Sequence, residues 1–193
     1  MKKTFPILLL LMVLFTDCNS PQIGNEPKDS PAIIPQIGNW QQELKEQLAL
    51  LGHRNWVLVV DAAYPLQSKP AIKTINTGED QIYVVKEVIE AIEKAPHVYP
   101  VVFLDKEIDF VPEKEAKGIG VYKKELDHLL KGKELSKVLH EELIATIDEA
   151  AKTFNILVLK TNMTIPYTSV FFRLDCGYWG AKQENKMREA MNK

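Results

Sequence analysis

Apolar residues recur at helical spacing in several stretches of this chain. From Trp40 onward, Leu44, Leu48 and Leu51 would share one face of a helix, and Gly52 is a natural residue at which that helix would stop. The same spacing recurs downstream, with apolar positions three or four residues apart. The sequence predicts helices over residues 40–51, 82–95, 121–130, 141–154 and 181–193, the last of which is polar.

Between these helices lie short, unbroken apolar runs such as Val57–Val60 and Val101–Leu104. Runs of this kind are typical of strands that are buried on both faces of a parallel sheet. Because strands and helices alternate, we expect an α/β fold in which a mostly parallel sheet carries helices on both faces. The predicted strands cover residues 56–60, 99–104, 155–159 and 170–174.

Three stretches have weaker patterns. Residues 65–78 contain two prolines and many polar side chains, which predicts a loop. Residues 105–120 are charged and hold two glycines, so we expect a connection or an insertion. Residues 134–139 fit a strand and a helix equally well.

The first residues indicate export. A basic start at Lys2-Lys3 precedes an apolar run over residues 5–15, which has signal-peptide length and is too short for a typical membrane span. Cys18 comes shortly after this run and resembles the lipid-attachment cysteine of bacterial lipoproteins. The alternative is an ordinary signal peptide with Cys18 incidental. In both cases we expect an exported protein of the bacterial cell envelope, either anchored to a membrane through lipid at Cys18 or periplasmic.

These patterns also predict the domain organisation. We expect a lipoprotein-type signal peptide over residues 1–17, a flexible tether over 18–39, a globular domain over 40–180 and a polar C-terminal helix over 181–193. If Cys18 is lipidated, Cys176 is the other cysteine and no internal disulfide can form. The net charge of −2 predicts no broad basic surface, so nucleic acid is not expected as a partner.

Two polar residues flank the first predicted strand. His53 comes after the helix stop, and Asp61 comes directly after Val60. A carboxylate after a strand lies at the carboxyl edge of the sheet, where open α/β sheets bind ligands. His53 has a side chain suited to acid/base chemistry near neutral pH, and it would reach that edge only if the chain folds back. The structural alternatives are an inert residue after a helix stop and a turn residue before Pro65.

Three further residues are candidates for ligand contact. His140 precedes two glutamates at a predicted helix start, and Tyr167 and Ser169 precede the last apolar strand. A tyrosine at that place could stack on a sugar or hydrogen-bond to it. The structural alternatives are a helix N-terminal residue for His140 and a strand-edge aromatic for Tyr167. The sequence contains no nucleophile elbow, phosphate loop or clustered metal motif, which favours cofactor-free chemistry or simple binding.

The order and spacing of these motifs resemble one known family. The segment from Leu51-Gly52-His53-Arg54-Asn55 through the strand to Asp61-Ala62-Ala63-Tyr64-Pro65 is similar to the opening of the RbsD/FucU family, which comprises D-ribose pyranase and L-fucose mutarotase. The eight-residue step from His53 to Asp61 is the family's step. The segment from Lys160-Thr161-Asn162-Met163 to Pro166-Tyr167-Thr168-Ser169-Val170 resembles its closing segment.

The resemblance implies an RbsD-like three-layer fold and a function. The expected reaction is interconversion of monosaccharide anomers or ring forms by acid/base ring opening, an isomerase activity that needs no cofactor and no metal. His53 would be the catalytic acid/base, and Asp61, His140, Tyr167 and Ser169 would orient the sugar hydroxyls. The family also implies a ring-shaped homo-oligomer whose sites are shared between neighbouring copies.

Several positions depart from the family pattern, among them Asn55, Met163 and Ser169. They motivate a first alternative, a sugar-binding lipoprotein that has lost catalysis. The exported context and the polar C-terminal helix motivate a second, a structural protein of the envelope that uses the fold for partner contact.

Overall fold

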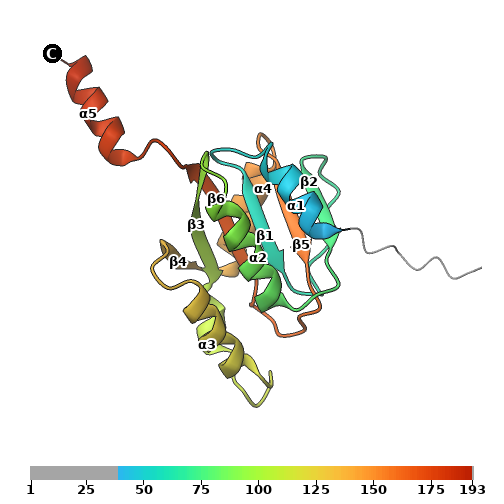
Figure 1. Cartoon of the computed structure of the whole chain (residues 1–193). Coiled ribbons are helices and arrows are strands. Elements are labelled where there is room, and N and C mark those ends of the chain that lie inside the picture. The colour runs from blue at the N-terminus through green and yellow to red at the C-terminus, as the bar shows by residue number, and fades with distance from the viewer. Residues whose placement is uncertain (1–38, 193) are drawn as a thin grey trace, which may run out of the picture. The chain divides into compact units, whose positions relative to one another are not determined.

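The computed structural model describes residues 39–192 of the chain (Figure 1). Its helices are α1 (Trp40–Leu48), α2 (Gln81–Glu93), α3 (Ile119–Leu129), α4 (His140–Ala150) and α5 (Ala181–Met191), with a short 3-10 helix η1 (Lys106–Phe110). Its strands are β1 (Trp56–Val60), β2 (Ile72–Asn76), β3 (Val98–Asp105), β4 (Leu135–Val138), β5 (Ile156–Lys160) and β6 (Val170–Cys176).

The strands form one six-stranded sheet in the order β2-β5-β1-β6-β3-β4. β1 pairs in parallel with β5, and β5 pairs in parallel with β2 on its other side. β3 pairs in parallel with β4. Of the six strands, β6 alone runs the other way, antiparallel to both β1 and β3. The mostly parallel sheet predicted from the alternating pattern is therefore confirmed.

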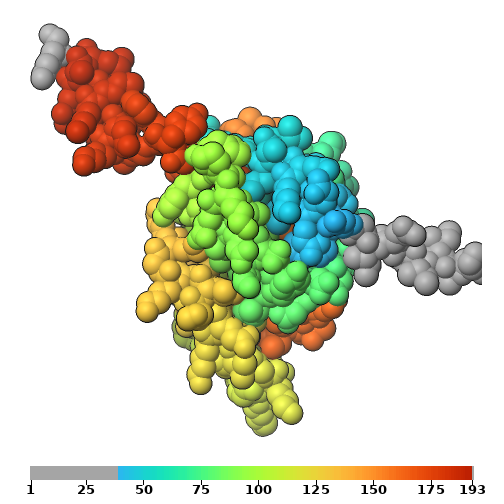
Figure 2. Space-filling view, in the orientation of Figure 1, coloured from blue at the N-terminus to red at the C-terminus, as the bar shows by residue number. Residues whose placement is uncertain are grey.

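Different helices cover the two faces of this sheet. Along β1, Val57 and Val59 pack into the core beneath α1, α2 and α3, whereas Leu58 points into the core beneath α4. Figure 2 shows the first of these faces, where α1 and α2 lie side by side. All five residues of β1 are buried, because helices cover both sides of the strand. This is the expected three-layer arrangement.

The predicted loop over residues 65–78 is wrong at its centre, where β2 forms an edge strand. Among the strands that the structure describes, β2 pairs with β5 alone, so one of its edges faces away from the sheet. Ile72 and Ile75 are buried, whereas Lys73 and Asn76 are exposed. Two apolar positions among polar ones are too weak a signal to distinguish such a strand from a loop.

The other edge strand lies in the stretch whose sequence fitted a strand and a helix equally well. Residues 134–139 contain β4, whose first three residues are exposed. Residues 105–120, expected to be a connection, contain η1 and the start of α3. Both edges of the sheet are thus polar, and a polar edge strand lacks the unbroken apolar run that made the central strands visible.

The predicted C-terminal helix is present as α5, and none of its residues is buried. Just before this helix, the indole Nε1 of Trp179 donates a hydrogen bond of 2.8 Å to Glu184 in its first turn. Within residues 39–192, no helix is both long enough and apolar enough to span a membrane. The expected signal peptide, tether and lipidated Cys18 lie outside the described residues, apart from Asn39, which caps α1.

Candidate functional site

Polar side chains from several strands meet at the carboxyl end of β1. Asp61 comes after β1, Asp105 ends β3 and His140 begins α4 shortly after β4. β6 runs antiparallel to β1, and Val59 pairs with Val170, so the segment before β6 reaches the same end. Tyr167 and Ser169 belong to that segment. The topology therefore brings together four of the predicted residues, Asp61, His140, Tyr167 and Ser169.

His140 is held by two carboxylates at the start of α4. Its ring Nδ1 lies 3.0 Å from Oδ1 of Asp105, whose side chain is 1% exposed. Its backbone N–H donates to both carboxylate oxygens of Glu107, each at 3.1 Å. Burial raises the pKa of Asp105, and the hydrogen bond with His140 opposes that rise. Oδ2 of Asp105 is buried and has no hydrogen-bond partner among residues 39–192.

Tyr167 packs against this histidine. The two rings meet edge to face, with centroids 5.6 Å apart and an interplanar angle of 80°. The backbone of Tyr167 adopts a left-handed conformation with φ of 58°, which is unfavourable for a residue with a side chain. The phenol is 38% exposed and is accessible to a ligand. Ser169, two residues further on, is only 2% exposed.

A buried polar network supports the segment that carries Tyr167. The hydroxyl of Thr161 donates to Oε1 of Gln81 at 2.9 Å, and Nε2 of Gln81 donates to the hydroxyl of Tyr122 and to the carbonyl of Thr168. The hydroxyl of Tyr122 also donates to this carbonyl, at 2.6 Å. Burial raises the pKa of Tyr122 far above its ordinary value. Gln81 thus ties the end of β5 to the start of β6 beneath the site.

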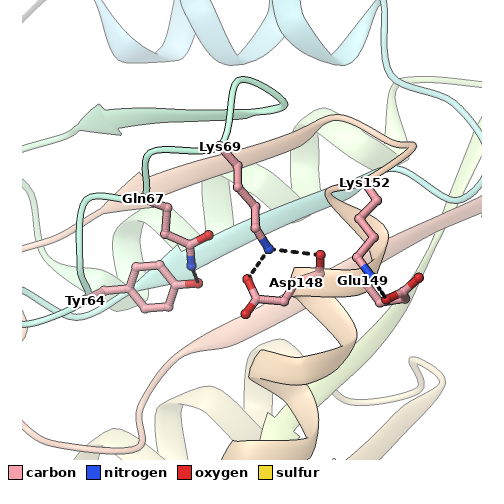
Figure 3. A network of polar contacts seen from close by, with 6 residues as sticks. All are labelled: Tyr64, Gln67, Lys69, Asp148, Glu149 and Lys152. Carbon is pink, nitrogen blue, oxygen red and sulfur yellow. Dashed lines mark hydrogen bonds and ion pairs between the residues drawn. The ribbon is translucent and has the colours of Figure 1, made fainter.

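The loop that carries Asp61 is pinned by two lysines. Nζ of Lys160 donates to the carbonyl of Tyr64 at 2.8 Å, and Nζ of Lys69 contacts both the carbonyl and the carboxylate of Asp148 on α4 (Figure 3). Oδ1 of Asp61 accepts a hydrogen bond from the N–H of Ala63 at 2.8 Å. The loop is therefore fixed on α4, and Asp61 is held at its start.

Tyr64 belongs to the same loop and points toward Gln67, whose Nε2 donates to the phenol oxygen at 3.0 Å. Burial raises the pKa of Tyr64 to about 12, and the nearby carboxylates, that of Asp148 first, contribute to this rise. The phenol is therefore neutral at physiological pH.

His53 lies at the opposite end of β1. Its Nδ1 is 2.6 Å from Oδ1 of Asp175, and both side chains are largely in water, at 56% and 41% exposed. The five residues of β1, at about 3.3 Å each, span about 17 Å between the two ends. The chain does not fold back there, so within one copy His53 is not brought together with the other four predicted residues.

An open cavity of about 760 Å³ borders this amino end of β1 and is lined in part by His53, Arg54, Arg173 and Asp175. The guanidinium of Arg54 lies 4.5 Å from the ring centroid of Phe154. Arg54 also has a left-handed backbone, with φ of 76°.

The prediction from sequence missed Asp105, Glu107 and Gln81. Asp105 ends the apolar run of β3 much as Asp61 comes after that of β1, so the same pattern could have identified it. Glu107 and Gln81 left no comparable signal. Within residues 39–192, no group of three or more His, Cys, Asp or Glu side chains is placed to hold a metal ion.

Comparisons with known proteins agree with this fold. A search of curated proteins found no match. Among solved structures, FucU from Bifidobacterium longum is similar, with a TM-score of 0.50 and 15% identity over 76% of this chain and 100% of that one. RbsD from Bacillus subtilis, complexed with D-ribose, has a TM-score of 0.49 and 19% identity over 72% of this chain and 93% of that one. The fucose mutarotase from Streptococcus pneumoniae, in complex with L-fucose, has a TM-score of 0.46 and 16% identity over the same shares.

The likeness to FucU shows the shared fold. The model of one family, the RbsD / FucU transport protein family, matches residues 38–176. That range includes every residue of the cluster at the carboxyl end of β1 as well as His53. Because the match extends over well more than half of the sequence, this chain belongs to the RbsD / FucU transport protein family.

Proposed function

We propose that this protein interconverts the anomers or ring forms of a monosaccharide by acid/base ring opening. Family membership supports this class of reaction, since the resemblance to this family implies the activities of D-ribose pyranase and L-fucose mutarotase. The observation that carries the proposal is the cluster at the carboxyl end of β1. There Asp61, His140 and Tyr167 combine a carboxylate, an imidazole and a phenol, which are groups that bind hydroxyls and exchange protons with them.

The chemistry needs proton transfer and positioning. A base removes the proton of the anomeric hydroxyl, and the bond between the anomeric carbon and the ring oxygen breaks. The electron pair of that bond stays on the ring oxygen, which takes up a proton from an acid. Rotation about the adjacent carbon–carbon bond and the reverse steps then give the other anomer. Atoms and electrons balance without any redox change, so side chains that move protons suffice.

We propose that His53 serves this site from a neighbouring copy of the chain. His53 lies about 17 Å along β1 from the cluster of its own copy, so a direct role within one chain is excluded by distance. The family resemblance implies homo-oligomers with shared sites. Charge bears on such a head-to-tail contact, because Asp61 and Glu107 add negative charge at one end of the copy, while Arg54 and Arg173 add positive charge beside Glu149 and Asp175 at the other.

Within residues 39–192, Arg54 and Arg173 form no ion pair with a carboxylate, whereas His53 is already paired with Asp175. The two guanidinium groups instead lie over the rings of Phe154 and Phe103. A carboxylate of a second copy would therefore find two guanidinium groups at this end of the sheet that are in no ion pair within residues 39–192.

The main alternative is a sugar-binding protein without catalysis. Asn55, one of the positions that depart from the family pattern, accepts from the N–H of Gly52 at 2.8 Å and donates to the carbonyl of Asn155 at 3.1 Å. Its role is thus structural and separate from proton transfer. Ser169 is nearly buried, which leaves it little surface for a sugar. The description of the family as transport proteins fits binding alone equally well.

Export and lipid attachment at Cys18 are part of the same proposal, and they rest on the sequence of the first eighteen residues. They would place the sugar site in the cell envelope, on a tether of about twenty residues. Mass spectrometry of the membrane fraction tests this directly, since lipidation adds the mass of the acyl groups to a chain that begins at Cys18.

The experiment that tests the function is saturation-transfer NMR on anomeric protons of ribose, fucose and galactose. The full chain is purified in detergent because of the expected lipid. We expect faster exchange than in the buffer blank for at least one sugar, loss of that acceleration in Asp61→Asn, and no change in His128→Gln, a histidine exposed on α3. Saturable binding without acceleration would replace the enzyme by the binding protein. Absence of binding to any sugar would overturn both.

A further inference from the structure

We infer that Asp105 is a positioning residue that fixes the tautomer of His140 and so leaves Nε2 of this imidazole as a proton acceptor toward the site. Asp105 would act through His140 and would not touch the sugar. The chemical consequence rests on the proposed function, whereas the tautomer itself is a property of the free protein.

The geometry around Asp105 is one-sided. Its Oδ1 lies 3.0 Å from Nδ1 of His140, while its Oδ2 is buried and has no hydrogen-bond partner in the described part of the chain. An ionised carboxylate can only accept hydrogen bonds, so the proton between the two groups belongs to Nδ1. In the neutral imidazole the lone pair is then on Nε2, at the other edge of the ring. The side chain of His140 is 38% exposed, which leaves room for a ligand at that edge.

His140 cannot easily turn away from this arrangement. Glu107 holds its backbone N–H with both carboxylate oxygens, and Tyr167 packs edge-on against its ring. The groups that act on the pair from the surrounding elements are therefore Asp105 of β3, Glu107 of η1, Asp61 after β1 and Tyr167 before β6. Three of the four are acidic, and of these it is Asp105 that contacts Nδ1 of the ring.

A competing state has the opposite tautomer. Burial raises the pKa of Asp105, and a protonated carboxyl would donate its own hydrogen to Nδ1. His140 would then carry its proton on Nε2 and could only donate to a sugar hydroxyl. The two states differ in which ring nitrogen is protonated, and that difference can be measured.

The chain contains its own reference for this measurement. Nε2 of His97 lies 3.0 Å from the carbonyl oxygen of Leu51 and 3.3 Å from that of Leu48. Carbonyl oxygens only accept, so His97 must carry its proton on Nε2. We therefore expect opposite tautomers for His97 and His140 in one spectrum.

The test is a long-range proton–nitrogen correlation spectrum of the ¹⁵N-labelled full chain, recorded well above the ordinary imidazole pKa. The sequence has four histidines, and a His→Gln variant of each assigns its signals. We expect a protonated Nδ1 and a bare Nε2 for His140. Asp105→Asn keeps an oxygen that accepts and should retain this state in part. Asp105→Leu removes the acceptor and should shift His140 toward the Nε2-protonated form that free imidazole prefers.

Asp175→Leu is the matched control, since it removes the carboxylate partner of the exposed His53 and should leave His140 unchanged. A protonated Nε2 of His140 in the unmodified protein would overturn the inference. Retention of the Nδ1 proton in Asp105→Leu would overturn it as well. The backbone amide spectrum verifies that each variant is folded. If Asp105→Leu does not fold, Asp105→Asn is compared with the unmodified protein instead.

No sugar enters this measurement, so its failure and the failure of the proposed function are separate. Where a sugar is exchanged, Asp105→Leu should lower kcat at least about tenfold with a smaller change in KM, because the base would lose its orientation. Asp105→Asn should restore part of that loss. A purely structural role for Asp105 would change stability without changing the tautomer.

Discussion

The two ends of β1 each carry a histidine–carboxylate pair, and the two pairs differ in their surroundings. At the amino end, His53 and Asp175 are 2.6 Å apart and largely in water. At the carboxyl end, His140 and Asp105 are 3.0 Å apart, and the carboxylate is 1% exposed. The shorter distance belongs to the weaker constraint, because water screens an exposed pair and competes for its hydrogen bonds. Burial, rather than distance, distinguishes the pair in which we infer that the carboxylate fixes the tautomer of its histidine.

Each end also has one residue other than glycine in a left-handed backbone conformation, Arg54 at the amino end and Tyr167 at the carboxyl end. Such residues store strain and are frequent at functional positions. At the carboxyl end the strain holds a ring against His140, and at the amino end it holds a guanidinium over Phe154. The two ends thus differ: the carboxyl end has a buried support, whereas the amino end is solvated and carries a guanidinium stacked on an aromatic ring.

The largest expected effect comes from the buried support of the carboxyl end. Gln81→Ala leaves Thr161, Tyr122 and the carbonyl of Thr168 without their shared partner in the core. We expect it to lower the free energy of unfolding by about 2–4 kcal/mol in urea denaturation. Gln41→Ala is the control, since its amide bonds to Tyr83 at the surface, and it should change stability by less than about 0.5 kcal/mol. Equal effects of the two substitutions on the free energy of unfolding would mean that the buried hydrogen bonds of Gln81 do not stabilise the carboxyl end more than a surface contact does.

Alkaline pH should weaken the loop that carries Asp61. The pKa of Tyr64 is raised to about 12 by burial, so the folded state keeps the phenol proton when the unfolded chain has lost it near pH 10. The stability that this proton contributes is present below pH 10 and is lost as the pH rises through about 12. At about 1.4 kcal/mol for each pKa unit, the loss approaches about 2–3 kcal/mol.

Urea denaturation between pH 9 and 12 measures this effect. Tyr64→Phe should remove that part of the pH dependence, and Tyr178→Phe, at a 74% exposed position, should not. An unchanged slope in Tyr64→Phe would show that the phenol is accessible to water and that the loop is not fixed on α4.

The exposed pair at the amino end should contribute little. We expect Asp175→Asn to change the free energy of unfolding by less than about 1 kcal/mol, and this difference should vanish in about 1 M salt, where charges are screened within a few ångströms. Asp105→Asn should give a difference that salt leaves unchanged. Thermal denaturation at two salt concentrations separates these cases, and a salt-independent effect of Asp175→Asn would remove the contrast between the two ends.

The smallest effects on stability are expected at the two strained residues. Arg54→Gly relieves about 1 kcal/mol of backbone strain and loses a cation–π contact of similar size, so the two nearly cancel. Tyr167→Gly should likewise leave stability within about 1 kcal/mol, and it should abolish sugar binding measured by calorimetry. Strong destabilisation by Tyr167→Gly would show that its ring serves the core rather than a ligand.

The buried centre of the fold could be predicted from sequence, and its edges could not. β1, β3, β5 and β6 are visible as apolar runs because both faces of the sheet are covered. β2 is polar at three of five positions, and local periodicity does not distinguish such an edge strand from a loop.

The candidate site shows the same division. Asp61, His140 and Tyr167 were recognised because they stand next to visible elements. Gln81 was missed because a glutamine at a helix start carries no sign that the core will bury it. His53 lies far from the other four residues because of the length of β1. A strand of five residues separates the residues at its amino end from those at its carboxyl end.

The most direct test of the central claim is a complementation experiment with two inactive variants. The claim is that the site at the carboxyl end of one copy works with His53 of the next. His53→Ala and His140→Ala are each expected to lose the acceleration of anomer exchange. When the two are co-expressed and assemble together, about a quarter of the sites combine two intact residues at random, and exchange should return to about that fraction. Full activity of His53→Ala alone, or no recovery in a mixed assembly, would contradict the account.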